Sequence, residues 1–283
     1  MRCALCSLAT VLCLIGSQSI AQHPALEAWK RRASNTRTLQ LKWRQASEHY
    51  KRHSKPIKFE GEFASSRSGK HRSWRFGVVN FGQLSAHEDF FVQRSLTTVN
   101  KRGERTTFFP KTNQEYPFAS IATKGQSSIN DLRLLPIALT YFPFEVQSWS
   151  IADGFTNSRS AQFDGHACLV FKLGEFEAWV KKGDKEFLPF RLTKHWSDGG
   201  LRYDFRIASG LSSDGTVRLD HWTFRQMGIG GLVEIENSRA ELEVCMVNSP
   251  IDSLQFSQVP FPTGTRINKD GQADISTANT AVK

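Results

Sequence analysis

Apolar and polar residues alternate with a period of two along most of this chain, and this pattern limits the fold more than any other feature. Successive side chains of a β-strand point to opposite faces, so the alternation predicts strands with one apolar and one polar face. It is clearest at Leu201, Tyr203, Phe205 and Ile207, which alternate with charged residues. Comparable segments are 39–44, 57–63, 74–78, 88–94, 96–109, 167–173, 176–180, 188–196, 217–226 and 239–247.

Short connections join many of these segments. Arg102-Gly103 and Asp198-Gly199-Gly200 are typical of hairpin tips, and residues 65–69 predict another turn. Roughly ten strands with such connections predict one large antiparallel sheet. In the last segment we expect Ala240, Leu242, Val244 and Met246 to share one face.

Two segments predict helices instead. Pro24 to Ser34 begins with a proline that suits a first helical turn. Ile129 to Phe144 carries leucines at helical spacing, and Pro136 should kink it or split it into two short helices. Residues 112–127 are polar and irregular. The second helical segment suits a lid over a cavity, and the alternative is an ordinary helix that covers one sheet face.

A sheet of this size must curl, and two helices are few to cover it. The sequence therefore predicts a mainly β (α+β) fold: a large curled antiparallel sheet, or unclosed β-barrel, with a few covering helices. A concave face lined by Phe, Trp and Leu would suit acyl chains. The predicted cavity and lid residues are Trp43, Phe59, Trp74, Phe76, Leu132, Leu135, Leu139, Phe142, Phe171, Trp179, Phe190 and Phe205. We expect Arg44 and Arg191 at a polar cavity mouth, with plain surface charges as the alternative.

The first 21 residues are typical of a secretory signal peptide. Arg2 precedes an apolar stretch from Cys3 to Gly16, and Ser19-Ile20-Ala21 predicts cleavage after Ala21. We therefore expect a periplasmic or secreted protein; an N-terminal membrane anchor is the alternative. No linker divides the remainder, which predicts a single lipid-binding domain over 22–267 and a polar, disordered tail over 268–283.

Three of the five cysteines lie in the predicted signal peptide, which leaves Cys168 and Cys245. In an oxidising compartment these two could form one disulfide. They could equally be two separate small apolar residues, because sequence does not reveal the separation of their Cα atoms.

Positive charge is concentrated near the start of the predicted mature chain. Residues 23–75 contain 14 Lys and Arg against 4 Asp and Glu, whereas residues 76–283 contain 22 against 23. Such a segment favours contact with an anionic membrane surface or an acidic partner, and the alternative is an ordinary solvated surface. No nucleic-acid-binding module is recognisable, so we expect no nucleic acid partner.

Catalytic and metal motifs are weak. The mature chain contains no GxSxG, HExxH, Walker or EF-hand pattern. A hydrolase or metal site could still be assembled across strands from histidines and nearby aspartates: His166, His195 and His221 with Asp164, Asp198 and Asp220. We expect instead a protein that is not an enzyme, needs no cofactor or metal, and is a monomer.

A stretch in the second half resembles a known family. Glu177-Ala178-Trp179-Val180-Lys181-Lys182, Phe187-Leu188-Pro189-Phe190-Arg191, Asp198-Gly199-Gly200 and Tyr203-Asp204-Phe205-Arg206-Ile207 are similar to the second half of periplasmic lipoprotein carriers of the LolA/LolB type. The chain departs from that pattern in its greater length, in the glycine spacing over 214–231 and in the Pro-Gly element at 259–265.

The resemblance implies an unclosed β-barrel covered by helices, whose apolar cavity takes acyl chains of lipids or lipoproteins. It also implies an arginine near the start of the sheet that holds the covering helix, for which Arg44 is the nearest candidate. The same fold serves as an envelope sensor domain, so an interaction module without catalysis is the alternative function.

Overall fold

The computed structural model of this chain describes residues 23–49, 57–69, 71–82, 91–110, 117–123, 129, 131–146, 148–149, 151, 158–256 and 261–275. The predicted signal peptide and residues 276–283 lie outside this part of the chain. Among the residues described, no helix combines the length and apolar character that a bilayer-spanning helix requires.

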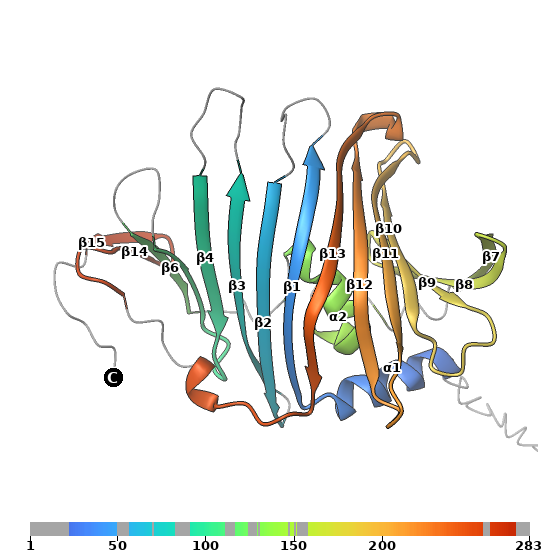
Figure 1. The fold of residues 1–283 in the computed structure, drawn as a ribbon, viewed down its shortest axis with the longest axis horizontal. Coiled ribbons are helices and arrows are strands. Elements are labelled where there is room, and N and C mark those ends of the chain that lie inside the picture. Colours follow the sequence, from blue (N-terminus) through green and yellow to red (C-terminus); the bar gives the residue numbers. More distant parts are fainter. Residues whose placement is uncertain are drawn as a thin grey trace, which may run out of the picture.

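One open sheet of 15 strands makes up most of the fold, in the order β15-β14-β6-β5-β4-β3-β2-β1-β13-β12-β11-β10-β9-β8-β7 (Figure 1). Neighbouring strands are antiparallel except β14 and β6, which are parallel. The strands are β1 Thr38–His49, β2 Ile57–Ser68, β3 His71–Gly82, β4 Phe91–Val99, β5 Arg105–Phe109, β6 Phe118–Ala122, β7 Arg159–Phe163, β8 His166–Leu173, β9 Phe176–Lys181, β10 Pro189–His195, β11 Leu201–Leu211, β12 Val217–Met227, β13 Glu234–Val247, β14 Arg266–Lys269 and β15 Gln272–Ile275. The predicted fold class is confirmed.

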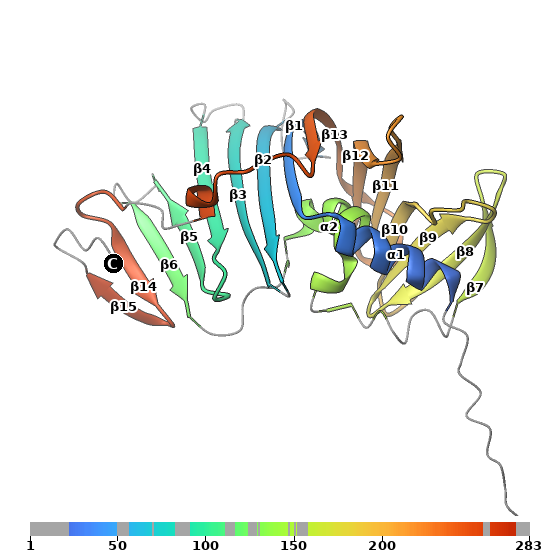
Figure 2. The same cartoon turned by 90° about the horizontal axis from the view of Figure 1, so that it is seen from below.

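Two α-helices, α1 (Pro24–Asn35) and α2 (Leu135–Tyr141), lie on the same side of the curled sheet (Figure 2). Short 3-10 turns flank α2: η1 (Leu132–Leu134) and η2 (Pro143–Glu145). Pro136 lies in the first turn of α2, where its missing N–H costs nothing. The predicted split therefore takes the form of a short α-helix that starts beside the proline, with a 3-10 turn on each side.

The alternation places the apolar side chains on the sheet face that α1 and α2 cover, which we call the inner face. Leu39, Leu41 and Trp43 of β1 are buried there, as are Trp74, Phe76 and Val78 of β3. Close packing requires glycine at one position of β2. A Cβ atom on Gly61 would lie 2.3 Å from the indole ring of Trp43.

The register between described strands shifts at five places, and three of these β-bulges bear on the predicted faces. In β10 the extra residue lies between Pro189 and Arg191. In β12 it lies opposite the step from Ala208 to Ser209, and in β13 it lies opposite the step from Lys42 to Trp43. A bulge places two residues opposite one, so inward and outward positions exchange beyond it. The face predicted for β13 is therefore wrong in its second half, where Cys245 and Val247 pack against the core and Met246 is 41% exposed.

Several short strands were not expected. The region predicted to be irregular contains β6, and the tail predicted to be disordered from residue 268 contains the second half of β14 and all of β15. The turn expected at 65–69 is shorter, because β2 continues to Ser68. These strands lack a strong apolar alternation. They form by backbone pairing near one edge of the sheet, where β14 pairs with β6.

Candidate functional site

The inner face carries a dense aromatic surface at its centre. The Trp43 ring stacks on Phe76 with 5.9 Å between centroids and lies 5.4 Å from Trp222 on β12. Phe205 on β11 and Phe224 on β12 are 4.6 Å apart. Such a surface can bind apolar groups, provided that something uncovers it.

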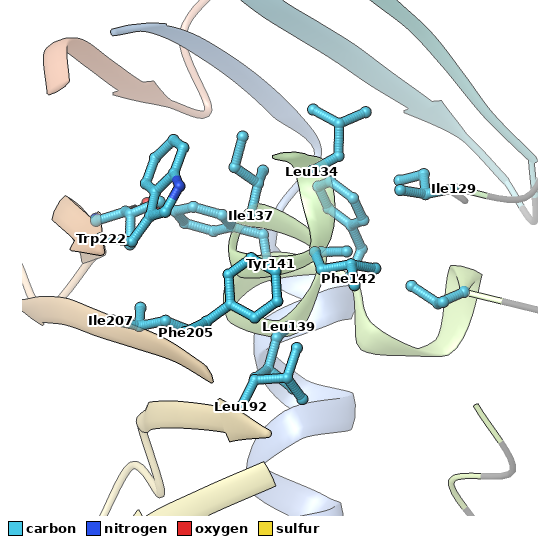
Figure 3. Packing of buried hydrophobic residues seen from close by; sticks show 14 of the residues in the cluster. Ile129, Leu134, Ile137, Leu139, Tyr141, Phe142, Leu192, Phe205, Ile207 and Trp222 are labelled. Atoms are coloured by element: carbon cyan, nitrogen blue, oxygen red, sulfur yellow. Dashed lines mark hydrogen bonds between the residues drawn. The ribbon is translucent and has the colours of Figure 1, made fainter. Parts of the chain in front are cut away.

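Helix α2 covers this surface. All seven of its residues are buried, and its sequence, LPIALTY, contains no charge. Figure 3 shows its side chains among sheet residues such as Trp222, Phe205 and Leu192. A helix that is apolar on every side is normally an interior element, and here it fills the concave side of the curled sheet.

Polar contacts from outside hold α2 in place at its C-terminal end. The first comes from Arg32 of α1, whose Nε donates to the backbone oxygen of Thr140 at 2.5 Å. Its Nη1 donates to the backbone oxygen of Glu186 at 3.0 Å. Burial lowers the pKa of Arg32 to about 10, although nearby carboxylates oppose this shift. Arg32 thus joins both helices to the loop before β10.

The second contact comes from Arg72 of β3, whose side chain is only 2% exposed. Its Nε lies 2.8 and 2.9 Å from the two carboxylate oxygens of Glu145 in η2. Its other nitrogens donate to the hydroxyl of Ser65 and to the backbone oxygen of Thr36. The guanidinium also lies over the Phe142 ring, at 4.7 Å from the centroid. This one side chain therefore joins α1, the sheet and the segment that follows α2.

The third contact is made by Tyr141, the last residue of α2. Its hydroxyl accepts a hydrogen bond from the backbone N–H of Leu219 at 2.9 Å and lies 3.3 Å from the Cys245 sulfur. Burial is the main reason that its pKa is raised well above the ordinary value for tyrosine. The neutral phenol is therefore the form that fits this site.

The inner face becomes polar toward the end of the sheet where β1 finishes and β13 begins, which we call the tip end. Gln45 donates to Ser238 at 2.8 Å, and Ser47 donates to Glu236 at 2.7 Å. Gln45 and Asn80 each keep a buried side-chain oxygen without a hydrogen-bond partner. Both are register partners of Phe59, so the two oxygens flank one aromatic residue.

Nine of the twelve predicted cavity residues belong to or pack against the main core: Trp43, Trp74, Phe76, Leu132, Leu135, Leu139, Phe142, Phe171 and Phe205. The structure brings these residues together between the inner face and α2. Phe59 is half-buried and lies at the tip end among Gln45, Ser47 and Asn80, which we call the polar row.

The other two, Trp179 and Phe190, lie on the opposite, outer face and form a small cluster with Cys168, Val170 and Phe163. Their assignment to the inner face is wrong. Trp179 lies between inward-facing neighbours in β9, so it must point outward. Phe190 is the extra residue of the β10 bulge and joins the outer cluster for that reason.

Neither arginine predicted at a cavity mouth lies on the inner face. Arg44 is 69% exposed on the outer face, with its Nε 2.9 Å from Glu243. Arg191 stacks over the Phe163 ring at 3.9 Å and binds the buried carboxylate of Asp204 at 2.7 Å. The helix-holding role suggested for Arg44 belongs instead to Arg32 and Arg72.

Weak signals could have identified these two residues. Arg72 has the same parity as the three inward-facing residues that follow it in β3, and Arg32 lies three residues after the buried Trp29 on one face of α1. An arginine at a predicted inward position indicates a buried polar contact, because an unpaired charge would be costly there.

Cys168 and Cys245 are free. Of the two alternatives that the sequence left open, the structure therefore has two separate cysteines rather than a disulfide. Cys168 lies in the outer cluster, whereas Cys245 packs against the core of the inner face, so the sheet separates the two sulfurs.

The candidate histidines occupy β8, β10 and β12, which are not neighbours in the sheet. Asp164 pairs with Arg206, and Asp198 accepts from the backbone of Gly200 within its own turn. Within the described ranges, no three His, Cys, Asp or Glu side chains are grouped so that they could hold a metal ion.

Several of the described arginines in the basic segment 23–75 are buried or paired. Arg32 and Arg72 are buried, while Arg44 and Arg75 pair with glutamates across neighbouring strands. Contact between this segment and an anionic membrane stays a prediction.

No protein-family model matches the chain, and no match is found among curated proteins. A DUF1329 family protein from Desulfovibrio piger superposes with a TM-score of 0.51 at 10% identity, over 83% of this chain and 94% of that chain. An outer membrane lipoprotein-sorting protein domain from Vibrio parahaemolyticus gives 0.51 at 9% identity with the same coverage. A LolA superfamily protein from Nitrosomonas europaea gives 0.38 at 11% identity, over 83% and 97%. The chain therefore shares its fold with the Desulfovibrio piger and Vibrio parahaemolyticus proteins.

Proposed function

We propose that this protein is a periplasmic or secreted carrier that binds acyl chains of lipids or lipoproteins between its inner face and α2. In this proposal the leader is cleaved after Ala21, and the protein works without catalysis. The observation that carries the proposal is α2 itself. It is a short, uncharged helix, buried on all sides, that occupies the concave side of an aromatic sheet.

Displacement of α2 would uncover a surface suited to acyl chains. The helix is roughly 10 Å long at 1.5 Å per residue, and its side chains contact apolar residues of the sheet. An acyl chain can replace those apolar contacts, whereas the buried side chain of Arg32 and the N–H of Leu219 would lose their partners on α2. The polar contacts that oppose displacement lie near its C-terminal end, at Thr140, Tyr141 and Glu145.

The polar row at the tip end supports an amphiphile rather than a plain hydrocarbon. The free oxygens of Gln45 and Asn80 are acceptors, so they would accept hydrogen bonds from an N–H or O–H group of the ligand. Leaving such groups unpaired is costly in a buried site. An acylated molecule with a donor-bearing head group would place that group beside Phe59 and its chain under α2.

The fold supports the same class of function. The Vibrio parahaemolyticus domain with this fold is described as a lipoprotein-sorting domain. The identity is too low to transfer a ligand, so the proposal rests on the inner face and α2.

Hydrogen exchange tests the proposal directly. The mature protein is exchanged with and without a saturating long-chain fatty acid, and peptides covering α2 are compared with peptides from β8 and β9. We expect the ligand to increase exchange in α2 while β8 and β9 are unchanged. Extraction of the protein purified from cell envelopes, followed by mass spectrometry, should identify the natural lipid.

A chain that binds no fatty acid and carries no lipid after purification would contradict the proposal. In that case α2 is a permanent part of the core. The alternative interaction module on the same fold would then be the better interpretation.

A further inference from the structure

The hairpin between β12 and β13 exposes a group of large apolar side chains. Ile229 is 83% exposed, Leu232 is 88% exposed, Val233 is 50% exposed and Ile235 is 41% exposed. They lie in and beside the 3-10 turn η3 (Ile229–Gly231), at the tip end of the sheet and at the end opposite to α1 (Figure 1). We call this group the apolar tip. Scattered exposed apolar residues are ordinary, but four within seven positions of one projecting turn are not.

The apolar tip is built as a defined structure. The N–H of Gly228 donates to the oxygen of Val233 at 2.7 Å, and the N–H of Gly231 donates to the oxygen of Gly228 at 3.0 Å. Gly230 and Gly231 have φ values of +75° and +70°, which favour glycine. The tip also rests on the neighbouring β10–β11 turn, where a Cβ atom on Gly200 would lie 2.7 Å from the carbonyl carbon of Gly230.

Few charged groups lie beside the tip, and the nearest carboxylate is that of the exposed Asp198, with Oδ2 4.0 Å from the Cβ position of Gly230. The carboxylate of Glu234, adjacent to the exposed Val233, is paired with Arg225 at 2.7 Å. In the adjoining turn region, Arg202 stacks on Trp196 with 4.2 Å between its guanidinium carbon and the ring centroid. Tryptophan and arginine of this kind are favoured at the level of lipid head groups.

We propose that the apolar tip docks on a lipid bilayer, with Ile229 and Leu232 inserted among the acyl chains near the head groups. A bilayer fits better than a protein partner for two reasons. The side chains project from a convex turn, and the turn satisfies part of its own backbone hydrogen bonding, which insertion into lipid demands. None of the four side chains of the apolar tip is charged.

The inference rests on the proposed carrier function and extends it. The polar row of the inner face lies at the same end of the sheet, since Ser47 pairs with Ser238 and His49 with Glu236 on the strand that leaves the tip. A docked protein would therefore present the head-group end of its inner face toward the membrane from which the lipid comes.

Flotation with vesicles tests the docking. Wild-type protein is mixed with vesicles of phosphatidylcholine, or of phosphatidylcholine with phosphatidylglycerol, and the bound fraction is measured. The double substitution Ile229→Ser and Leu232→Ser should weaken partitioning by about 100-fold, at about tenfold for each side chain. The matched control replaces two other exposed apolar residues, Leu211→Ser and Met246→Ser, at the opposite end of the sheet. This control should bind like the wild type.

A second measurement tests insertion of the tip without using the double variant. Ile229→Trp adds a fluorophore at the tip, and vesicles made with brominated lipid should quench its emission more than they quench wild-type emission. Absence of wild-type flotation with both vesicles, or equal flotation of the double variant, would overturn the docking. So would wild-type dimerisation that the double substitution abolishes while flotation is unchanged, since the tip would then bind a second copy.

Separate measurements distinguish failure of the carrier function from failure of the membrane docking. Fatty acid binding is measured without vesicles for the wild type and the tip variant, which should bind equally because the tip is remote from α2. A protein that floats through its tip but binds no fatty acid would refute the carrier function and leave the docking intact. A protein that binds fatty acid but does not float would refute the docking alone.

Discussion

Arg72 offers the sharpest test of how α2 is held, because one side chain joins three elements around it. The substitution Arg72→Met keeps a side chain of similar length that can still lie against the Phe142 ring. It removes both hydrogen bonds to Glu145 and those to Ser65 and Thr36. The perturbation is therefore confined to the charge and its polar contacts.

The structure sets the expected size of the effect. Removal of one partner from a buried ion pair typically costs about 3–5 kcal/mol, because the other partner is left uncompensated. Here the Glu145 side chain is 30% exposed and can regain water, while the Arg72 side chain is only 2% exposed. We therefore expect the lower end of that range, about 3 kcal/mol less free energy of unfolding.

Urea denaturation measures this change, with Arg75→Met as the matched control. Arg75 lies on the same strand but faces outward, is 36% exposed and pairs with Glu62 at 3.5 Å. Exposed pairs of this kind are worth about 0–1 kcal/mol, so the control should lose little stability. Equal urea midpoints for the two variants would refute the buried role of Arg72.

The same variant connects stability with binding. If α2 must leave the inner face for a ligand to bind, weakening its attachment raises the population of the open form. Apparent affinity for a fatty acid should then increase about tenfold for each ~1.4 kcal/mol removed, until the open form predominates. A loss of stability with unchanged or weaker affinity would show that α2 does not control access.

Three further predictions concern other parts of the core. Tyr141→Phe leaves a buried backbone N–H without its acceptor and should lower the free energy of unfolding in urea by about 1–3 kcal/mol. Because burial raises the pKa of Tyr141, this tyrosine ionises at lower pH in the unfolded chain than in the folded one. The difference in unfolding free energy between wild type and variant should therefore be constant below about pH 9 and shrink as the pH rises through about 10. Gly61→Ala should destabilise the protein by at least about 1–3 kcal/mol through overpacking, whereas Gly210→Ala, with open space around its Cβ position, should be tolerated; similar melting temperatures would count against the packing described. Without reductant, the mature protein should show two thiols on denaturation, at Cys168 and Cys245, and a single disulfide-linked mass would contradict the structure; in the folded state Cys168 should react slowly, because burial raises its pKa.

Local alternation was enough to predict the fold class. Period two defined most of the longer strands, and helical spacing with a proline located both helices, because these patterns depend only on which neighbours share a face. The same reasoning gathered most of the predicted inner-face residues correctly, from Trp43 to Phe205.

The tertiary structure decided the rest. The bulges in β10, β12 and β13 depend on strand partners that are distant in sequence, so no local pattern could show that Phe190 and Met246 would leave the inner face. Short strands near the sheet edge, such as β14, form by backbone pairing, which leaves little trace in side-chain hydrophobicity. The buried arginines that hold α2 find their partners on other elements of the fold. The sequence determines which side of each strand is apolar, whereas the partners that meet across the fold are set by long-range packing.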